Sequence, residues 1–226
     1  MADEPLALVT GAASGLGAAV AAELLSDHRV VGLDVNPPAD GVEFERVDLA
    51  DSAAAERAVA SVAGRGRLAV LVAAAGTDTP GELEELPREI WERTVLVNLL
   101  GTAAVVRAAL PHLAQNRGRV VTVASTLGFR VFPAATAYCA SKFGVVGFTR
   151  ALAAETAGRV GVTLLVPGGM RTAFFDERDE EFRPGPDAML NDPRDVARAV
   201  RFVVSQPPGC EVRELVVAPA VEPSWP

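Results

Sequence analysis

The chain has 226 residues, of which 50% are hydrophobic, and a net charge of −8 at pH 7. This length suits one α/β domain with a sizeable core. The acidic excess argues against a nucleic-acid or anionic-membrane partner, so we predict neither. Two cysteines give no disulfide framework, and the acidic N-terminus lacks the features of a signal peptide. We therefore expect a cytoplasmic protein.

The first apolar run leads into a glycine-rich turn. Residues 6–10 are typical of a buried parallel strand, and the sequence GAASGLG (residues 11–17) opens an alanine-rich helical stretch to about Ser26. Glycines let the backbone approach a pyrophosphate closely, and a helix N-terminus offers free N–H groups. The turn therefore indicates a phosphate site. Two alternatives stay open: Ser14 as an ordinary helix cap, and a glycine loop without function.

A second predicted strand, residues 29–34, ends in a carboxylate. Asp34 follows Gly17 by 17 residues, near the spacing of about 20 at which an acidic residue binds the adenosine ribose 2′-hydroxyl. A carboxylate there would repel the 2′-phosphate of NADP, and neither Ser14 nor Val35 supplies a cation for it. We therefore predict NAD, with NADP disfavoured. Asp34 also fits the start of a turn at Asn36.

The remaining elements continue the alternation of strand and helix. Strands are predicted at residues 42–47, 68–75, 118–124, 160–166 and 212–217, and helices at 51–63, 88–113, 136–158 and 193–205. This order predicts a Rossmann-type doubly wound α/β fold, with a parallel sheet of about seven strands covered by helices on both faces. We expect one domain over residues 1–226, without a metal site. Residues 170–192 have the composition of a mobile flap, or of an ordinary solvated loop.

The most informative pair is Tyr138 and Lys142, the only tyrosine and the only lysine in the chain. Four residues apart on a helix, they share one face. There an ammonium would lower the pKa of the phenol and let it exchange a proton near neutral pH. An ordinary amphipathic contact is the alternative.

Two further polar residues occupy conspicuous positions. Asn98 stands within an apolar run at residues 95–100, where a buried amide must be hydrogen-bonded. A structural bond to a strand end and a catalytic role are both open. Ser125 directly follows a predicted strand, and the carboxyl ends of parallel strands face the ligand crevice. Ser125 also fits the start of a turn.

In this order the motifs resemble the short-chain dehydrogenase/reductase family, in its compact single-domain branch. The family's Thr-Gly-x-x-x-Gly-x-Gly pattern matches residues 10–17, its Tyr-x-x-x-Lys matches the pair above, and its serine stands thirteen residues before the tyrosine. Two departures are an alanine run at residues 73–75, where the family has asparagines, and a C-terminus without the usual glycine-rich ending. The residues that match outside the glycine motif are Asn98, Ser125, Tyr138, Lys142, Pro167, Gly168 and Thr172.

The resemblance implies an NAD-dependent oxidoreductase that interconverts a secondary alcohol and a carbonyl compound by hydride transfer. Tyr138 would be the general acid/base, and Ser125 would hydrogen-bond the substrate oxygen. Lys142 would lower the tyrosine pKa and bind the nicotinamide ribose, and Asn98 would hold a water of a proton relay. The implied cofactor-binding residues are Gly11, Ser14, Gly15, Leu16, Gly17, Asp34, Asp48, Leu49, Ala74, Ala75, Gly76, Tyr138, Lys142, Pro167, Gly168, Met170 and Thr172.

The expected partners are a small-molecule alcohol or ketone and further copies of the chain. The resemblance implies a homotetramer or homodimer formed through the helices at residues 88–113 and 136–158, and we expect Trp225 to pack against a neighbouring subunit. Two other functions remain possible: a cofactor-binding regulator or scaffold of the same fold without turnover, and an isomerase or epimerase that uses bound NAD. Relatives of the isomerase type carry a longer substrate domain than this chain has room for.

Overall fold

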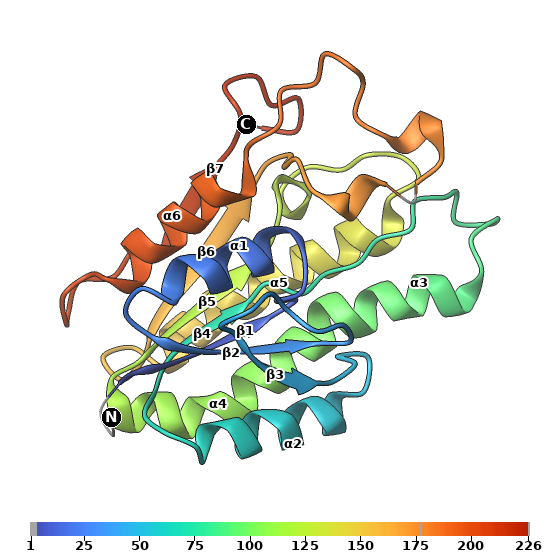
Figure 1. Ribbon diagram of the computed structural model, residues 1–226. Helices are drawn as coiled ribbons and strands as arrows, with labels where there is room; N and C mark the ends of the chain where they lie inside the picture. The colour runs from blue at the N-terminus through green and yellow to red at the C-terminus, as the bar shows by residue number, and fades with distance from the viewer. Residues whose placement is uncertain (1–3, 177, 226) are drawn as a thin grey trace.

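The computed structural model describes residues 4–176 and 178–225. A seven-stranded sheet lies at its centre (Figure 1), in the order β3-β2-β1-β4-β5-β6-β7. Every pair of neighbouring strands is parallel, so the predicted Rossmann-type fold is confirmed. The strands are β1 (Leu6–Thr10), β2 (Arg29–Asp34), β3 (Glu43–Arg46), β4 (Leu68–Ala73), β5 (Arg119–Val123), β6 (Gly161–Pro167) and β7 (Glu214–Val217).

Helices cover both faces of the sheet, as Figure 1 shows for α1 and α6 on one side and α2 and α4 on the other. The buried apolar side chains form separate clusters with each layer, because successive residues of a strand point to opposite faces. The long helices are α1 (Gly15–Leu24), α2 (Ser52–Ala63), α3 (Arg88–Val95), α4 (Thr102–Asn116), α5 (Thr136–Glu155) and α6 (Pro193–Val204).

The order of the strands in the sheet indicates where a ligand would bind. From β1 the chain proceeds outward through β2 to β3, then returns to β4 beside β1 and proceeds outward again to β7. The strand order therefore reverses between β1 and β4, and ligands of open α/β sheets bind outside the carboxyl ends of the strands at such a point. The glycine turn follows β1 at this point.

One continuous helical stretch joins α3 and α4 through a π-helical turn, Leu96–Gly101, that contains Asn98. The stretch Arg88–Asn116 is long and apolar enough to cross a membrane by length and composition, but half of its apolar window is buried inside the fold. Its side chains at Val105, Val106 and Ala109 are fully buried in the core. It therefore packs as a core helix. Short π-helical turns inside longer helices are frequently found at functional sites.

The C-terminal tail folds back over the end of β6. Trp225 packs edge-to-face against Phe129 of the same chain, with ring centroids 5.5 Å apart. The Ser224 hydroxyl lies 2.7 Å from the Thr126 hydroxyl, and Glu222 accepts from the backbone N–H of Gly169 at 2.8 Å. The structure thus gives Trp225 an intramolecular partner, and its contact with a neighbouring subunit stays a prediction.

We predict that Trp225→Ala lowers the free energy of unfolding by about 1 kcal/mol or more, because it removes an aromatic pair and its buried area. Urea denaturation of the variant and the wild type measures this difference. Val221→Ala is the control, since Val221 is 66% exposed and its truncation removes little buried surface. Equal stabilities of the Trp225 variant and the wild type would show that the tail does not brace the fold.

Candidate active site

The glycine turn and the end of β4 lie against each other. Gly11 has a φ of +71°, which favours glycine, and a Cβ on it would stand 2.8 Å from the Ala75 Cα. The backbone N–H of Ala75 donates to the Thr10 hydroxyl at 3.0 Å. Alanine at positions 73–75 therefore still permits this contact, which uses only backbone atoms of the β4 end.

The N-terminus of α1 is open toward a ligand. Ser14 occupies the N-cap position with extended backbone, as the helix-cap alternative predicted, but its hydroxyl forms no capping hydrogen bond. A Cβ on Gly17 would collide with the Gly11 carbonyl oxygen, and one on Gly15 would lie 3.5 Å from the Thr172 methyl carbon. These residues therefore form a close cradle of backbone around the helix end, which is the arrangement that binds a pyrophosphate.

Asp34 faces this cradle. Its Oδ2 accepts from the backbone N–H of Ala13, and its Oδ1 accepts from that of Asn36, both at 3.0 Å. Asp34 therefore both starts the turn after β2 and stands beside the glycine loop. The cradle and the adjacent carboxylate fit an adenosine dinucleotide, with the phosphates at α1 and the ribose at Asp34.

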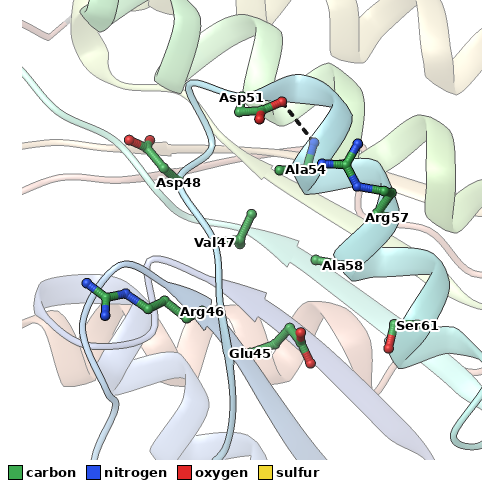
Figure 2. Close-up of a pocket in the computed structure, with 9 residues that line it drawn as sticks. All are labelled: Glu45, Arg46, Val47, Asp48, Asp51, Ala54, Arg57, Ala58 and Ser61. Carbon is green, nitrogen blue, oxygen red and sulfur yellow. Dashed lines mark hydrogen bonds between the residues drawn. The ribbon is translucent and has the colours of Figure 1, made fainter.

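Two predicted cofactor contacts have buried side chains. Leu16 and Leu49 are 6% and 5% exposed and belong to the core, so only their backbone atoms can meet a ligand. Asp48 lies at the edge of a surface hollow of about 460 Å³ beside α2. Figure 2 shows Asp48 across that hollow from the α2 helix, whose N-cap Asp51 bonds the N–H of Ala54 at 2.9 Å.

Asn98 links three elements. Its amide nitrogen donates to the Thr77 carbonyl oxygen at 2.9 Å and to the Ser141 hydroxyl at 3.1 Å, and its Oδ1 accepts from the Thr77 N–H at 2.8 Å. The structural reading of Asn98 is therefore confirmed: it holds the loop after β4 against α5. The backbone carbonyl oxygen of Asn98 accepts from the Thr102 hydroxyl at 2.8 Å.

Tyr138 and Lys142 come together on α5, with the Lys142 ammonium 5.5 Å from the centroid of the Tyr138 ring. Lys142 is 4% exposed, and its Nζ donates to the carbonyl oxygen of Val123, at the end of β5, at 2.9 Å. Ser125 follows that strand, and its side chain is close enough to the Tyr138 hydroxyl to act on the pKa of the phenol. Its Oγ also accepts from the Leu127 N–H at 3.1 Å. The predicted serine, tyrosine and lysine thus form one cluster.

The pKa of Tyr138 shifts against the expected direction. Burial raises it to about 12, the hydrogen bond with Ser125 opposes this rise, and the Asp78 carboxylate adds to it. Burial also lowers the pKa of Lys142 to about 8, against the attraction of Asp78. The prediction that Lys142 lowers the tyrosine pKa is wrong in this conformation, because desolvation of the phenol dominates and the ammonium is directed at Val123.

On the other side of the cradle, Pro167 ends β6, and Gly168, Met170 and Thr172 follow the strand. The Gly168 N–H donates to the Val217 carbonyl oxygen at 3.0 Å, and the backbone of Met170 pairs with that of Asn191 in an isolated parallel β-bridge. The Thr172 hydroxyl accepts from the Phe174 N–H at 3.4 Å. Since Thr172 also lies beside Gly15, this segment and the glycine turn lie next to each other.

Sequence reasoning missed an ion pair in the site. Arg178 Nη2 lies 2.8 Å from Asp78 Oδ2, and the two side chains are only 13% and 4% exposed. Arg178 stacks on Phe174 and Phe175, with its Cζ 4.7 Å from each ring centroid, and the Phe174 ring lies 5.8 Å from that of Tyr138. The predicted flap therefore reaches the catalytic cluster. Its mobility stays a prediction. The sequence of residues 170–192 gave no signal for an ion pair with a residue 100 positions away.

Together these features define a Rossmann-type dinucleotide-binding fold with a Ser–Tyr–Lys cluster at the carboxyl ends of its strands. The model of the short chain dehydrogenase family matches residues 5–182. The chain belongs to the short-chain dehydrogenase/reductase family, and it is an oxidoreductase that acts on CH–OH groups of small molecules.

Individual relatives agree with this assignment. The chain is 36% identical over 184 residues to the NAD⁺-dependent 2-dehydro-3-deoxy-L-rhamnonate dehydrogenase of a Sphingomonas strain, covering 76% of this chain and 74% of the relative. It is 33% identical to glycine betaine reductase ATRR of Emericella nidulans, covering 96% of this chain but spanning only 19% of that protein's length. An alcohol dehydrogenase of the archaeon Thermococcus sibiricus, complexed with 5-hydroxy-NADP, superposes with a TM-score of 0.83 at 26% identity and covers 94% of this chain and 95% of its own.

The buried lysine predicts a pH dependence of stability. Its pKa falls from an ordinary 10.5 to about 8 in the folded protein, so between these values only the unfolded chain binds the proton. Stability conferred through Lys142 then rises with pH, by up to about 1.4 kcal/mol per pH unit. Urea unfolding of the wild type and Lys142→Met from pH 7 to pH 10 should give curves that diverge in this sense above about pH 8. Parallel curves would show that burial does not lower the pKa of Lys142.

Proposed function

We propose that the chain is an NAD(H)-dependent oxidoreductase that interconverts a secondary alcohol and a carbonyl compound, with Tyr138 as general acid/base. The observation that carries this proposal is the cluster at Tyr138, where the Ser125 side chain acts to lower the pKa of the phenol and the buried Lys142 ammonium lies 5.5 Å from the centroid of the ring. These groups stand at the carboxyl ends of the strands, beside an open helix N-terminus that fits a dinucleotide phosphate.

In carbonyl reduction, Tyr138 gives its proton to the oxygen that becomes the alcohol, and Ser125 donates a hydrogen bond to the same oxygen as negative charge develops there. A pKa raised to about 12 keeps the phenol protonated at neutral pH, so the resting side chain is ready for this direction. A bound nicotinamide would supply or accept the hydride. Alcohol oxidation needs the phenolate, so this direction should become faster as the pH rises.

Asp34 supports NAD over NADP. Its carboxylate stands beside the glycine loop, where it would accept a hydrogen bond from the ribose 2′-hydroxyl and repel a 2′-phosphate. One relative carries NAD⁺ in its name, whereas the archaeal structure holds a derivative of NADP, so the choice rests on the Asp34 carboxylate itself. The same fold without turnover, as a cofactor-binding regulator, is the competing function, and the cluster of Ser125, Tyr138 and Lys142 argues against it.

We also propose that the chain assembles as a homodimer or homotetramer through α4 and α5 and the π-helical turn between α3 and α4. Leu100 and Phe143 support this, because these large apolar side chains are 46% and 45% exposed on those elements. A cytoplasmic location remains a prediction of the sequence.

We predict that Tyr138→Phe lowers kcat/KM for ketone reduction by about 100- to 10,000-fold, the contribution of general acid catalysis. NADH consumption with a panel of ketones measures the loss. NADH binding, followed by fluorescence, should be retained, because the phenylalanine preserves the ring beside the cofactor. A variant that retains full turnover would refute the assigned acid.

Cofactor choice gives a separate prediction. Asp34→Asn keeps one side-chain oxygen but removes the negative charge, so NAD should bind about 10- to 100-fold more weakly and NADP more tightly than in the wild type. Titration with both oxidised dinucleotides measures this reversal. Asp40→Asn, at an exposed carboxylate in the loop after β2, should leave both affinities unchanged. Tighter NADP than NAD binding by the wild type would overturn the reading of Asp34.

A further inference from the structure

Asp78 and Arg178 each keep a buried polar atom without a partner. The ion pair uses Asp78 Oδ2 and Arg178 Nη2. Within the described residues, Asp78 Oδ1 and Arg178 Nε are buried and form no hydrogen bond. A buried polar group left unsatisfied costs about 1–3 kcal/mol, so native proteins rarely retain two of them in one ion pair. One acceptor and one donor of the pair therefore remain without a partner.

The pair stands on the substrate side of the catalytic tyrosine. Arg178 stacks on Phe174, whose ring centroid lies 5.8 Å from that of Tyr138. Asp78 follows Thr77, whose backbone is fixed from both sides by the Asn98 side chain. The charges of the pair also act on Tyr138, where Asp78 raises the pKa and Arg178 lowers it. The pair therefore lies near the reacting oxygen, and its loop is fixed by the amide of Asn98.

The charge and the two free atoms restrict what can bind. The pair is neutral overall, so it offers no net attraction to a carboxylate or phosphate, and Asp78 would repel either. A hydrocarbon group would leave both atoms unsatisfied. A hydroxyl group satisfies both at once, because its hydrogen donates to Asp78 Oδ1 while its oxygen accepts from Arg178 Nε. Hydrogen bonds to charged groups are the stronger ones.

We propose that Asp78 and Arg178 form a subsite for a second hydroxyl group of the substrate, so that the enzyme acts on diols or polyols and on the matching hydroxy ketones. The proposal rests on the alcohol–carbonyl chemistry proposed above and adds the substrate class. Asp78 belongs to the fixed loop after β4, whereas Arg178 belongs to the segment at residues 170–192. The subsite is therefore complete only when that segment lies over the site.

Reduction of two matched ketones tests the subsite. 3-Hydroxy-2-butanone and 2-butanone differ by one hydroxyl group. The wild type should show a kcat/KM for the hydroxy ketone about 10- to 100-fold above that for 2-butanone, the discrimination that hydrogen bonds to charged groups supply. Arg178→Lys and Asp78→Asn should lose most of this preference, because reduction of the hydroxy ketone should slow more than reduction of 2-butanone.

An exposed ion pair of the same residue types supplies the control. Arg198 and Asp195 are 64% and 54% exposed on α6, and Arg198→Lys and Asp195→Asn should retain the wild-type preference. Equal rates of the wild type on the two ketones, or equal losses on both ketones in the Asp78 and Arg178 variants, would overturn the subsite and leave the pair a purely structural contact.

Failure of the proposed chemistry has a different signature. If Tyr138→Phe reduces each ketone as fast as the wild type does, the acid/base assignment fails. If neither ketone is turned over, thermal unfolding in the presence of NADH decides for the subsite. 2,3-Butanediol should then raise the unfolding temperature of the wild type more than 2-butanol does, and this difference should vanish in Arg178→Lys. Equal shifts with both alcohols in the wild type would overturn the proposal.

Discussion

The amide of Asn98 is the interaction on which the site depends. A single buried side chain satisfies both backbone groups of Thr77 and the hydroxyl of Ser141, and so joins the loop after β4 to α5. That loop carries Gly76 and Asp78, and α5 carries Tyr138 and Lys142. Loss of one partner would leave buried polar groups unsatisfied. The helix must therefore present Asn98 at one position, and the π-helical turn is where it does so.

Desolvation sets the electrostatics of the cluster. Burial disfavours the charged form of both groups. It therefore raises the pKa of Tyr138, which stays protonated, and lowers the pKa of Lys142, which becomes easier to deprotonate. Asp78 and Arg178 add two charges whose effects on the tyrosine oppose each other. The buried charges are thus paired or hydrogen-bonded, as they must be at such depth.

Most of the fold was predictable because its signals are local. Alternating apolar strands and helices, ended by glycine or a polar residue, fixed the layers and the strand directions. The glycine turn, Ser125 and the pair Tyr138–Lys142 were readable as spaced motifs. Contacts between distant segments were not readable, since Asp78 and Arg178 lie far apart in the chain and belong to loops without periodicity. The same holds for Trp225, whose partner Phe129 is set by how the tail folds back.

The direction of the tyrosine pKa shift shows a second kind of limit. A lysine four residues away suggested a lowered value, but the sequence does not report how deeply a phenol is buried or where the ammonium points. In the structure Lys142 donates to the Val123 carbonyl oxygen, and burial becomes the larger effect. Spacing identified the partners, whereas the direction of the tyrosine pKa shift depended on how deeply the phenol is buried.

The bond from the Gly169 N–H to Glu222 has a consequence for the order of folding. The segment after β6, which faces the glycine turn, is held by a residue 53 positions later in the chain. During synthesis on a ribosome, the sheet from β1 to β6 can emerge and pack while this segment still lacks its anchor. The segment after β6 therefore acquires this anchor only once the last strand and the tail have been synthesised.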